Sequence, residues 1–188
     1  MHRDELWQNY AKNGQPIADG GYPASLDNPP FGTDKIVGVC CVLLYRQTEQ
    51  GLEVLFQKRS RFVDRNPETW DISAGGHVNY GEDERSAAIR EAYEEIGAVV
   101  DADKLELVAS DMAASRTNRL RFIYCYDWGE QPDSFHFDDQ EVSEVRWVPF
   151  TKFDEFIDEN AKLPLKEDHL IREIIKRFLK SHENRTTK

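Results

Sequence analysis

The sequence has few cysteines, no long apolar run and a deficit of basic residues, and each shortage excludes a class of protein. Three cysteines among 188 residues are too few, and wrongly spaced, for a disulfide framework or a closed zinc site. The longest apolar run, residues 36–45, has ten residues, whereas a membrane-spanning helix needs about 18 or more. The 24 Lys and Arg residues against 35 Asp and Glu give a net charge of −11. This balance argues against a nucleic-acid polymer as partner, because phosphate backbones are bound by clustered basic residues.

The composition is that of a soluble globular domain. Hydrophobic residues make up 39% and charged residues 31% of the chain, a balance typical of folded domains rather than of disordered or fibrous ones. The first residues, Met-His-Arg-Asp-Glu, lack the apolar segment of a secretory signal. We therefore expect a cytoplasmic protein that does not bind a membrane and that forms one domain of ordinary size.

The pattern of turn signals and apolar segments divides the chain into three parts. Residues 1–34 contain turn signals such as Gly20-Gly21 and are predicted to be an N-terminal extension, in which a short helix is expected around residues 4–12. Residues 35–181 form the predicted domain. Residues 182–188 form a polar tail.

Strand-like and helix-like segments follow one another within the predicted domain. Residues 35–46 are apolar without alternation, which is typical of a strand buried on both faces. Further strands are expected at residues 52–59, 105–114, 120–128 and 144–148, and helices at residues 83–96, 153–160 and 166–180. We infer one α+β domain in which helices flank a mixed sheet.

The predicted helix over residues 83–96 gathers acidic side chains. On a helix with about 100° per residue, one side carries Glu84, Glu91, Glu94 and Glu95, and the apolar stripe away from it consists of Ile89, Ala92, Tyr93 and Ile96. The small Ala87 lies on the acidic side, where it is expected to leave space for a substrate. The pattern predicts a helix that packs with one side and presents carboxylates on the other.

A divalent cation would offset the repulsion between these carboxylates. Like charges three or four residues apart destabilise an exposed helix. Arg90 reaches Glu94 at the i, i+4 position, but nothing cationic on the same side offsets all three of Glu91, Glu94 and Glu95. Mg²⁺ and Mn²⁺ prefer closely spaced oxygen ligands and share their coordination with substrate phosphates. The alternative interpretation is a solvated, charged helix face without a metal.

The spacing of the charged and glycine residues favours the metal. The pattern is glycine, five residues, glutamate, seven residues, Arg-Glu, two residues, Glu-Glu, one residue, glycine, and its members are Gly76, Glu82, Arg90, Glu91, Glu94, Glu95 and Gly97. This segment resembles the Nudix box at every charged and glycine position and departs from it only in the small Ala92 and Ala98. With weaker similarity over about residues 35–150, the chain resembles the Nudix hydrolases.

The resemblance implies an αβα sandwich around a central mixed sheet. It also implies a hydrolase that uses Mg²⁺ or Mn²⁺ to cleave the diphosphate linkage of a nucleoside diphosphate derivative. Glu91, Glu94 and Glu95 would bind the metal, joined by the carbonyl of Gly76. Among these, Glu91 and Glu94 would take part in catalysis, and Arg90 would support it by holding the loop and the helix together.

A base and a substrate site are expected outside this segment. The resemblance implies a base from a late loop, for which Glu141 is the candidate and Asp139 the reserve, and the alternative for Glu141 is an ordinary surface acid. Lys58 and Arg59 belong to the densest basic cluster of the chain and would bind phosphate, with ordinary surface charge as the alternative. The predicted substrate site consists of Lys58, Arg59, Trp70, Gly75 and Gly76. For Trp70, packing in the core is the alternative.

Two other functions are compatible with parts of this pattern. Isopentenyl diphosphate isomerase shares the fold, but it needs a cysteine near the position of Gly75 and a histidine-rich metal site, and residues 3–76 contain no histidine. The approach to His77 still resembles that side of the superfamily, so a non-nucleoside diphosphate stays open as substrate. A non-catalytic nucleotide-binding module would be expected to lose its metal ligands, which are intact here. We therefore favour a hydrolase with a small-molecule diphosphate substrate, and the resemblance allows a homodimer by analogy.

Overall fold

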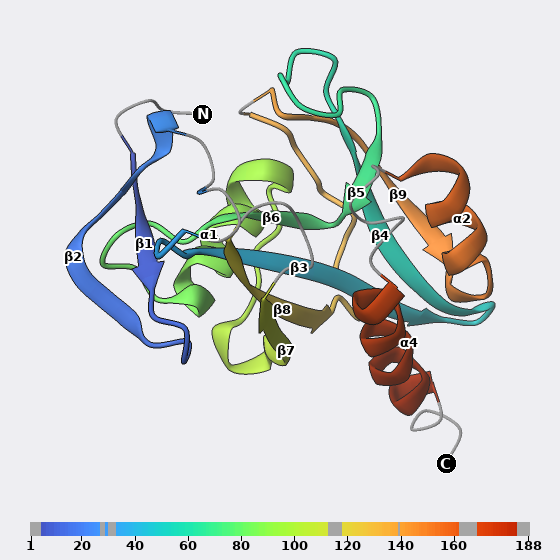
Figure 1. The fold of residues 1–188 in the computed structure, drawn as a ribbon. Helices are drawn as coiled ribbons and strands as arrows, with labels where there is room; N and C mark the ends of the chain where they lie inside the picture. The colour runs from blue at the N-terminus through green and yellow to red at the C-terminus, as the bar shows by residue number, and fades with distance from the viewer. Residues whose placement is uncertain are drawn as a thin grey trace.

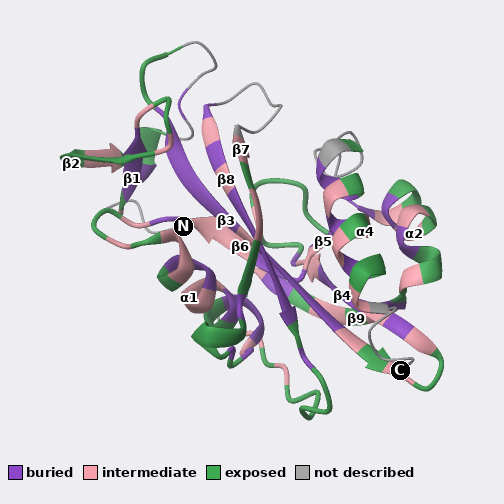
Figure 2. Cartoon of the chain, turned by 90° about the horizontal axis from the view of Figure 1, so that it is seen from below, coloured by how far each residue is buried: buried purple, intermediate pink, exposed green. Residues whose placement is uncertain are grey.

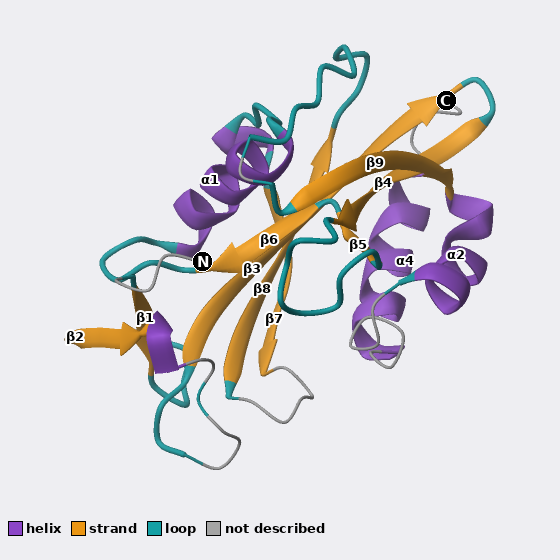
Figure 3. Cartoon of the chain, turned by 90° about the horizontal axis from the view of Figure 1, so that it is seen from above, coloured by secondary structure: helices purple, strands orange, loops and turns teal. Residues whose placement is uncertain are grey.

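The sheet and the helices form three layers. The computed structural model describes residues 5–26, 29, 33–112, 118–138, 140–161 and 169–183. Within these residues nine strands join one mixed sheet, with one helix against one face and two helices against the other (Figure 1 and Figure 3). This arrangement confirms the predicted α+β fold with a central mixed sheet.

β3 (Val37–Thr48) is the central strand of this sheet. Its antiparallel partners are β1 (Leu6–Tyr10), β4 (Gly51–Arg59) and β6 (Ala74–His77), and its parallel partner is β8 (Arg119–Asp127). The sheet continues with β2 (Pro16–Pro23) beside β1, with β5 (Trp70–Ile72) and β9 (Val142–Pro149) beside β4, and with β7 (Glu106–Met112) beside β8. Figure 2 shows β3 buried along most of its length, which confirms the prediction from its unbroken apolar sequence.

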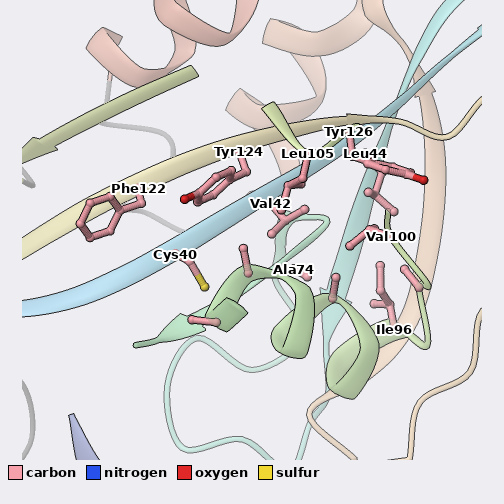
Figure 4. Close-up of a cluster of buried hydrophobic side chains, with 14 of the residues drawn as sticks. Cys40, Val42, Leu44, Ala74, Ile96, Val100, Leu105, Phe122, Tyr124 and Tyr126 are labelled. Carbon is pink, nitrogen blue, oxygen red and sulfur yellow. The ribbon is translucent and has the colours of Figure 1, made fainter. Parts of the chain in front are cut away.

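The side chains of β3 divide between two cores. Cys40 belongs to the core under α1 (Glu84–Ile96), which Figure 4 shows in close-up. Leu43 belongs to the core on the other face, under α2 (Phe153–Asn160) and α4 (His169–Glu183). Because helices cover both faces, neither face of the strand has room for alternating polar side chains.

Local capping fixes both ends of α1. The Asp83 carboxylate accepts hydrogen bonds from the backbone N–H groups of Arg85 (3.0 Å) and Ser86 (2.9 Å), which is the usual N-cap arrangement. Gly97 follows the last turn with φ 67°, the left-handed conformation that favours glycine. The predicted helix over residues 83–96 is therefore confirmed, and Asp83 and Gly97 explain where it begins and ends.

The two helices of the other face agree with prediction where they are described. α2 covers the predicted residues 153–160. α4 is described from His169 and continues to Glu183, into the predicted polar tail, while the expected helical residues 166–168 lie outside the described part of the chain. None of the described helices combines the length and the apolar character needed to cross a bilayer.

The expected helix around residues 4–12 is wrong, because this segment is part of a β-hairpin. β1 and β2 pair antiparallel, and β1 also pairs with β3 through Asn9 and Val37. Four of the five residues of β1 are buried, so both faces of the strand are covered. Gly20 and Gly21 of β2 adopt positive φ, which lets the outer strand bend around the inner one. A strand here gains backbone partners on two sides that a helix would not.

Asp19 links the two strands of this hairpin and pairs with Lys35, which precedes β3. Its carboxylate accepts hydrogen bonds from the Asn9 amide of β1 at 2.9 and 3.0 Å and forms an ion pair with Lys35 at 2.8 Å. The bond from Asn9, followed by that from Lys35, lowers the pKa of Asp19 to about 2. Since the folded-state pKa lies below the ordinary value of 3.8, the carboxylate stabilises the fold above about pH 4 and loses this effect as the pH falls toward 2.

We expect Asp19→Asn to lower the free energy of unfolding by up to about 1 kcal/mol near neutral pH, because the pair is partly exposed to water. The difference from wild type should shrink as the pH falls from 5 to 3. Urea unfolding at a series of pH values measures both effects. Glu49→Gln in the exposed turn between β3 and β4 is the control, and an Asp19→Asn deficit that stays constant with pH would contradict the assignment.

Candidate active site

The glycine pair Gly75 and Gly76 brings the edge of the sheet against α1. Both residues lie on β6, opposite Cys41 and Cys40 of β3. A Cβ atom added to Gly75 would lie 2.6 Å from the Cys40 carbonyl oxygen, and one added to Gly76 would collide with the Glu91 carboxylate. A side chain at Gly75 would collide with the backbone of β3, and one at Gly76 would displace the Glu91 carboxylate, which lies directly on the backbone of β6.

We expect Gly76→Ala to displace Glu91 and to lower the free energy of unfolding by about 1–3 kcal/mol, as overpacked substitutions do. Chemical unfolding measures this cost. The double variant Gly76→Ala with Glu91→Ala removes the carboxylate that the new methyl group would strike. It should be more stable than the sum of the two single changes predicts. Additive losses would show that the two residues are not in contact.

Arg90 ties three carboxylates and one carbonyl together. Its guanidinium donates to both oxygens of Glu82 (3.1 and 3.0 Å), to Glu91 (2.8 Å), to Glu94 (2.9 Å) and to the carbonyl oxygen of His77 (2.9 Å). Burial works to lower the pKa of Arg90, but the bonds to Glu82, Glu91 and Glu94 outweigh it and raise that pKa. The predicted pair between Arg90 and Glu94 is present, and Arg90 joins the loop before α1 to the helix itself.

Glu95 is a buried carboxylate held by neutral donors. Only 4% of its surface is exposed. Its Oε2 accepts hydrogen bonds from the Gln57 side-chain amide (2.9 Å) and from the backbone N–H of Gly75 (2.8 Å), and within the described residues neither Lys nor Arg pairs with it. Burial, and then the charge of Glu91, raise the pKa of Glu95 well above its ordinary value. Its negative charge is therefore unfavourable in the metal-free fold.

Glu91 has a related but less extreme environment. Its side chain is 14% exposed, and burial raises its pKa to about 7 although Arg90 acts in the opposite direction. Glu94 and Glu141 add to the rise through their charges. Glu91 and Glu95 are thus two neighbouring carboxyl groups whose charged forms are disfavoured by burial and by each other, and Arg90 pairs only with Glu91 of the two.

The predicted division of α1 into an acidic and a packed side is correct for Ala92 and Ile96, which are buried, and for Glu94, which is exposed, but it is wrong for three other residues. Ala87 is fully buried, so it does not leave open space for a substrate, and Glu95 lies on the same buried side. Tyr93, placed in the apolar stripe by the pattern, is 55% exposed. The packed side of the helix therefore includes two of the carboxylates, because the backbone of β6 and Gln57 supply polar partners that a helical projection does not contain.

The oxygen atoms of these carboxylates and of the Gly76 carbonyl fit a divalent cation. Carboxylate and carbonyl oxygens are hard ligands that suit Mg²⁺ and Mn²⁺, and the buried charge of Glu95 would gain from a cation. Among the residues that the structure describes, no three His, Cys, Asp or Glu side chains already converge as a metal site. Instead, Arg90 Nη1 bonds to both Glu91 and Glu94. Metal binding by Glu91, Glu94, Glu95 and the Gly76 carbonyl stays a prediction.

The predicted base lies at the margin of this cluster. Glu141 precedes β9 and is half-buried, its backbone carbonyl accepts a hydrogen bond from the Ser60 N–H (2.7 Å), and its charge reaches Glu91. Ser60 follows directly on Arg59 of the predicted substrate site. Asp139, the reserve, lies outside the described residues.

The remaining predicted substrate residues occupy different surroundings. Lys58 pairs in register with Trp70 and Glu144, and Arg59 Nε donates to the backbone carbonyl of Arg65 at 3.1 Å. Trp70 is 6% exposed and packs in the core below α2, beneath the guanidinium of Arg146 at 4.6 Å. Lys58 and Arg59 remain partly accessible, whereas the indole of Trp70 is covered.

Sequence reasoning missed Gln57 as a partner of the cluster. It is a buried polar residue in an otherwise apolar stretch of β4 and the donor to Glu95. A single glutamine between Phe56 and Lys58 was the available signal, since buried amides require a hydrogen-bond partner.

The structure combines a mixed sheet between helices with a loop that follows the glycine pair and a group of glutamates bonded to Arg90. This combination is that of the Nudix class of fold. A family model described as NUDIX domain matches residues 34–174, three quarters of the chain, and the chain belongs to this family.

Individual relatives agree with this assignment. Nudix hydrolase 3 of Arabidopsis thaliana is 29% identical over 126 residues, a match that covers 62% of this chain but only 16% of that relative. A crystal structure from Deinococcus radiodurans superimposes with a TM-score of 0.69 at 23% identity and covers 90% of this chain and 99% of its own. The NUDIX domain of Shewanella oneidensis NrtR, solved in complex with ADP ribose, gives a TM-score of 0.59 at 18% identity, with 82% and 96% coverage. Both structural likenesses concern the fold.

Proposed function

We propose that this protein is a divalent-metal-dependent hydrolase that cleaves the diphosphate linkage of a nucleoside diphosphate derivative. The observation that supports this most strongly is the burial of Glu91 and Glu95 beside the glycine pair, since buried like charges are unfavourable unless a cation compensates them. The intact set of carboxylates distinguishes this proposal from that of a non-catalytic binding module.

In this proposal Glu91, Glu94, Glu95 and the carbonyl of Gly76 hold the metal. When bound, Mg²⁺ or Mn²⁺ supplies positive charge opposite the phosphate oxygens and makes a water molecule more acidic. Gln57 and the Gly75 N–H fix the orientation of Glu95 through bonds of 2.9 and 2.8 Å.

The other polar residues orient the substrate and receive the proton. Arg90 keeps Glu91 and Glu94 in position and ties them to the loop at His77. Glu141 accepts the proton of the attacking water, from a position close enough to Glu91 for their charges to interact. Lys58 and Arg59 bind substrate phosphate by charge-assisted hydrogen bonds.

The substrate proposal combines the chemistry of the site with one neighbour. The NUDIX domain of Shewanella oneidensis NrtR was solved in complex with ADP ribose, which is a nucleoside diphosphate linked to a sugar. Compounds of this class carry the diphosphate that the metal-binding residues and Lys58 would hold between them. A histidine-rich isomerase site finds less support, because the His77 ring stacks on an indole at 3.6 Å and Gly75 has no room for a cysteine side chain.

Turnover on a substrate panel tests the proposal. The purified protein is incubated with Mg²⁺ or Mn²⁺ and with nucleoside diphosphate sugars, dinucleoside polyphosphates, dinucleotide cofactors and non-nucleoside diphosphates. We expect two phosphate-bearing products from at least one nucleoside diphosphate derivative, and none after chelation of the metal. Binding of these compounds without cleavage, with either metal, would favour the binding module instead.

A further inference from the structure

The N-terminal hairpin, residues 6–23, is bonded directly to the loop that leads into α1. The backbone N–H of Gln8 donates to the carbonyl of Val78 (2.8 Å), and the N–H of Tyr80 donates to the carbonyl of Leu6 (2.8 Å). The side-chain oxygen of Gln8 accepts a third bond from the N–H of Gly81 (3.1 Å). β1 therefore pairs with this loop through backbone hydrogen bonds of the kind that join two strands. Figure 1 shows the hairpin beside the connection from β6 to α1.

An aromatic stack reinforces these backbone bonds. The rings of Trp7 and His77 are stacked with centroids 3.6 Å apart and an interplanar angle of 4°. Trp7 is 1% exposed, and Tyr22 of β2 packs against it from the other strand of the hairpin. The indole is thus a buried support for the residue that follows Gly76.

A single residue, Arg90, connects the stacked His77 to the carboxylate cluster through hydrogen bonds. The carbonyl oxygen of His77 accepts from Arg90 Nη2 (2.9 Å), and Arg90 Nη1 holds Glu91 and Glu94. A shift of His77 would therefore move the carbonyl that Arg90 is bonded to and, with it, the neighbouring Gly76. The whole hairpin lies before residue 34, where the family match begins.

We propose that the N-terminal hairpin clamps the loop before α1 and that Trp7 is a positioning residue for the metal-binding carboxylates. This inference rests on the proposed metal site and deepens it. Trp7 touches neither substrate nor metal; it acts through His77 and Arg90. The clamp keeps Gly76, Arg90 and Glu91 in one arrangement, so that metal binding does not have to order the loop.

Binding of Mn²⁺ to the full chain, measured by electron paramagnetic resonance without substrate, tests the clamp. Trp7→Leu keeps an apolar side chain but removes the stack, and Trp7→Phe restores an aromatic ring. Ile175→Ala, in the core under α4 and 1% exposed, destabilises the fold at a distance from the loop. We expect Trp7→Leu to weaken Mn²⁺ binding by about 10-fold, as loss of a supporting contact around metal ligands does. Trp7→Phe should recover most of it and Ile175→Ala should leave it within about twofold.

Hydrogen exchange gives a second readout that needs no metal. The amides of Tyr80 and Gly81 should exchange faster in Trp7→Leu than in wild type, because their acceptors lie on the hairpin, and should be unchanged in Ile175→Ala. If Trp7→Leu does not fold, Gln8→Met takes its place. This change removes the acceptor for the Gly81 N–H and the two hydrogen bonds that the Gln8 amide donates to the carbonyls of Asn9 and Ile17.

Unchanged Mn²⁺ affinity and exchange in Trp7→Leu, or equal losses in Ile175→Ala, would overturn the clamp. A wild type that binds Mn²⁺ but hydrolyses nothing would refute the proposed function and leave the clamp standing. A wild type that binds no Mn²⁺ would overturn the metal-positioning role of Trp7.

Discussion

Glu95→Gln is expected to lower kcat of diphosphate hydrolysis by about 100-fold or more, the scale of losing one well-placed electrostatic contact in an active site. The same substitution should make the metal-free protein more stable than wild type at pH 8, because it removes a buried negative charge whose bonds come from neutral donors. Activity assays and thermal unfolding without metal measure the two effects. Their opposite signs separate a functional carboxylate from a structural one.

Glu159→Gln is the matched control for this change, since Glu159 is exposed on α2. It should alter neither quantity. Mg²⁺ should also stabilise Glu95→Gln less than it stabilises the wild-type protein. A variant that is less stable than wild type without metal and still fully active would show that Glu95 is simply a structural acid.

Arg90→Ala is expected to remove both activity and much of the stability. It leaves Glu82 and Glu91, which are 17% and 14% exposed, without the guanidinium that bonds to them. Removing one partner of a buried charge pair typically costs about 3–5 kcal/mol, and we expect about 3 kcal/mol here because Arg90 itself is partly exposed. At about 2–4 °C per kcal/mol for a chain of this length, the melting temperature should fall by about 10 °C.

Arg177→Ala on the exposed side of α4 is the control and should change the melting temperature little. Added Mn²⁺ should recover part of the lost stability in Arg90→Ala, because a cation would again offset Glu91 and Glu94. A melting temperature close to that of wild type would contradict the role of Arg90 as the tie between loop and helix.

The parts of the fold that depend on local chemistry were predictable from the sequence. The limits of α1 follow from the Asp83 side chain and from the left-handed Gly97, and both signals are visible in the residues themselves. The burial of β3 follows from an apolar stretch without alternation. The grouping of Gly76, Arg90 and Glu91 was implied by the family resemblance that their spacing carries, although no local rule states that Gly76 must admit a carboxylate.

The errors concern residues whose partners come from distant segments. The helical projection placed Glu95 on the acidic side of α1, apart from the packed side, but the Gln57 side chain of β4 and the Gly75 backbone N–H bind it in the interior. Residues 4–12 were expected to be helical, but β3 and the loop at residues 78–81 offer backbone partners to a strand. Such long-range pairings override local preference, and the sequence near each residue carries no record of them.

The most direct test of the central claim is a crystal of the protein soaked in Mn²⁺, with anomalous scattering recorded to locate the ion. We predict a Mn²⁺ ion bound by Glu91, Glu94 and Glu95 and close to the Gly76 carbonyl. A map without an ion at these residues, with Arg90 still bonded to Glu91 and Glu94, would contradict a metal-dependent hydrolase built on α1.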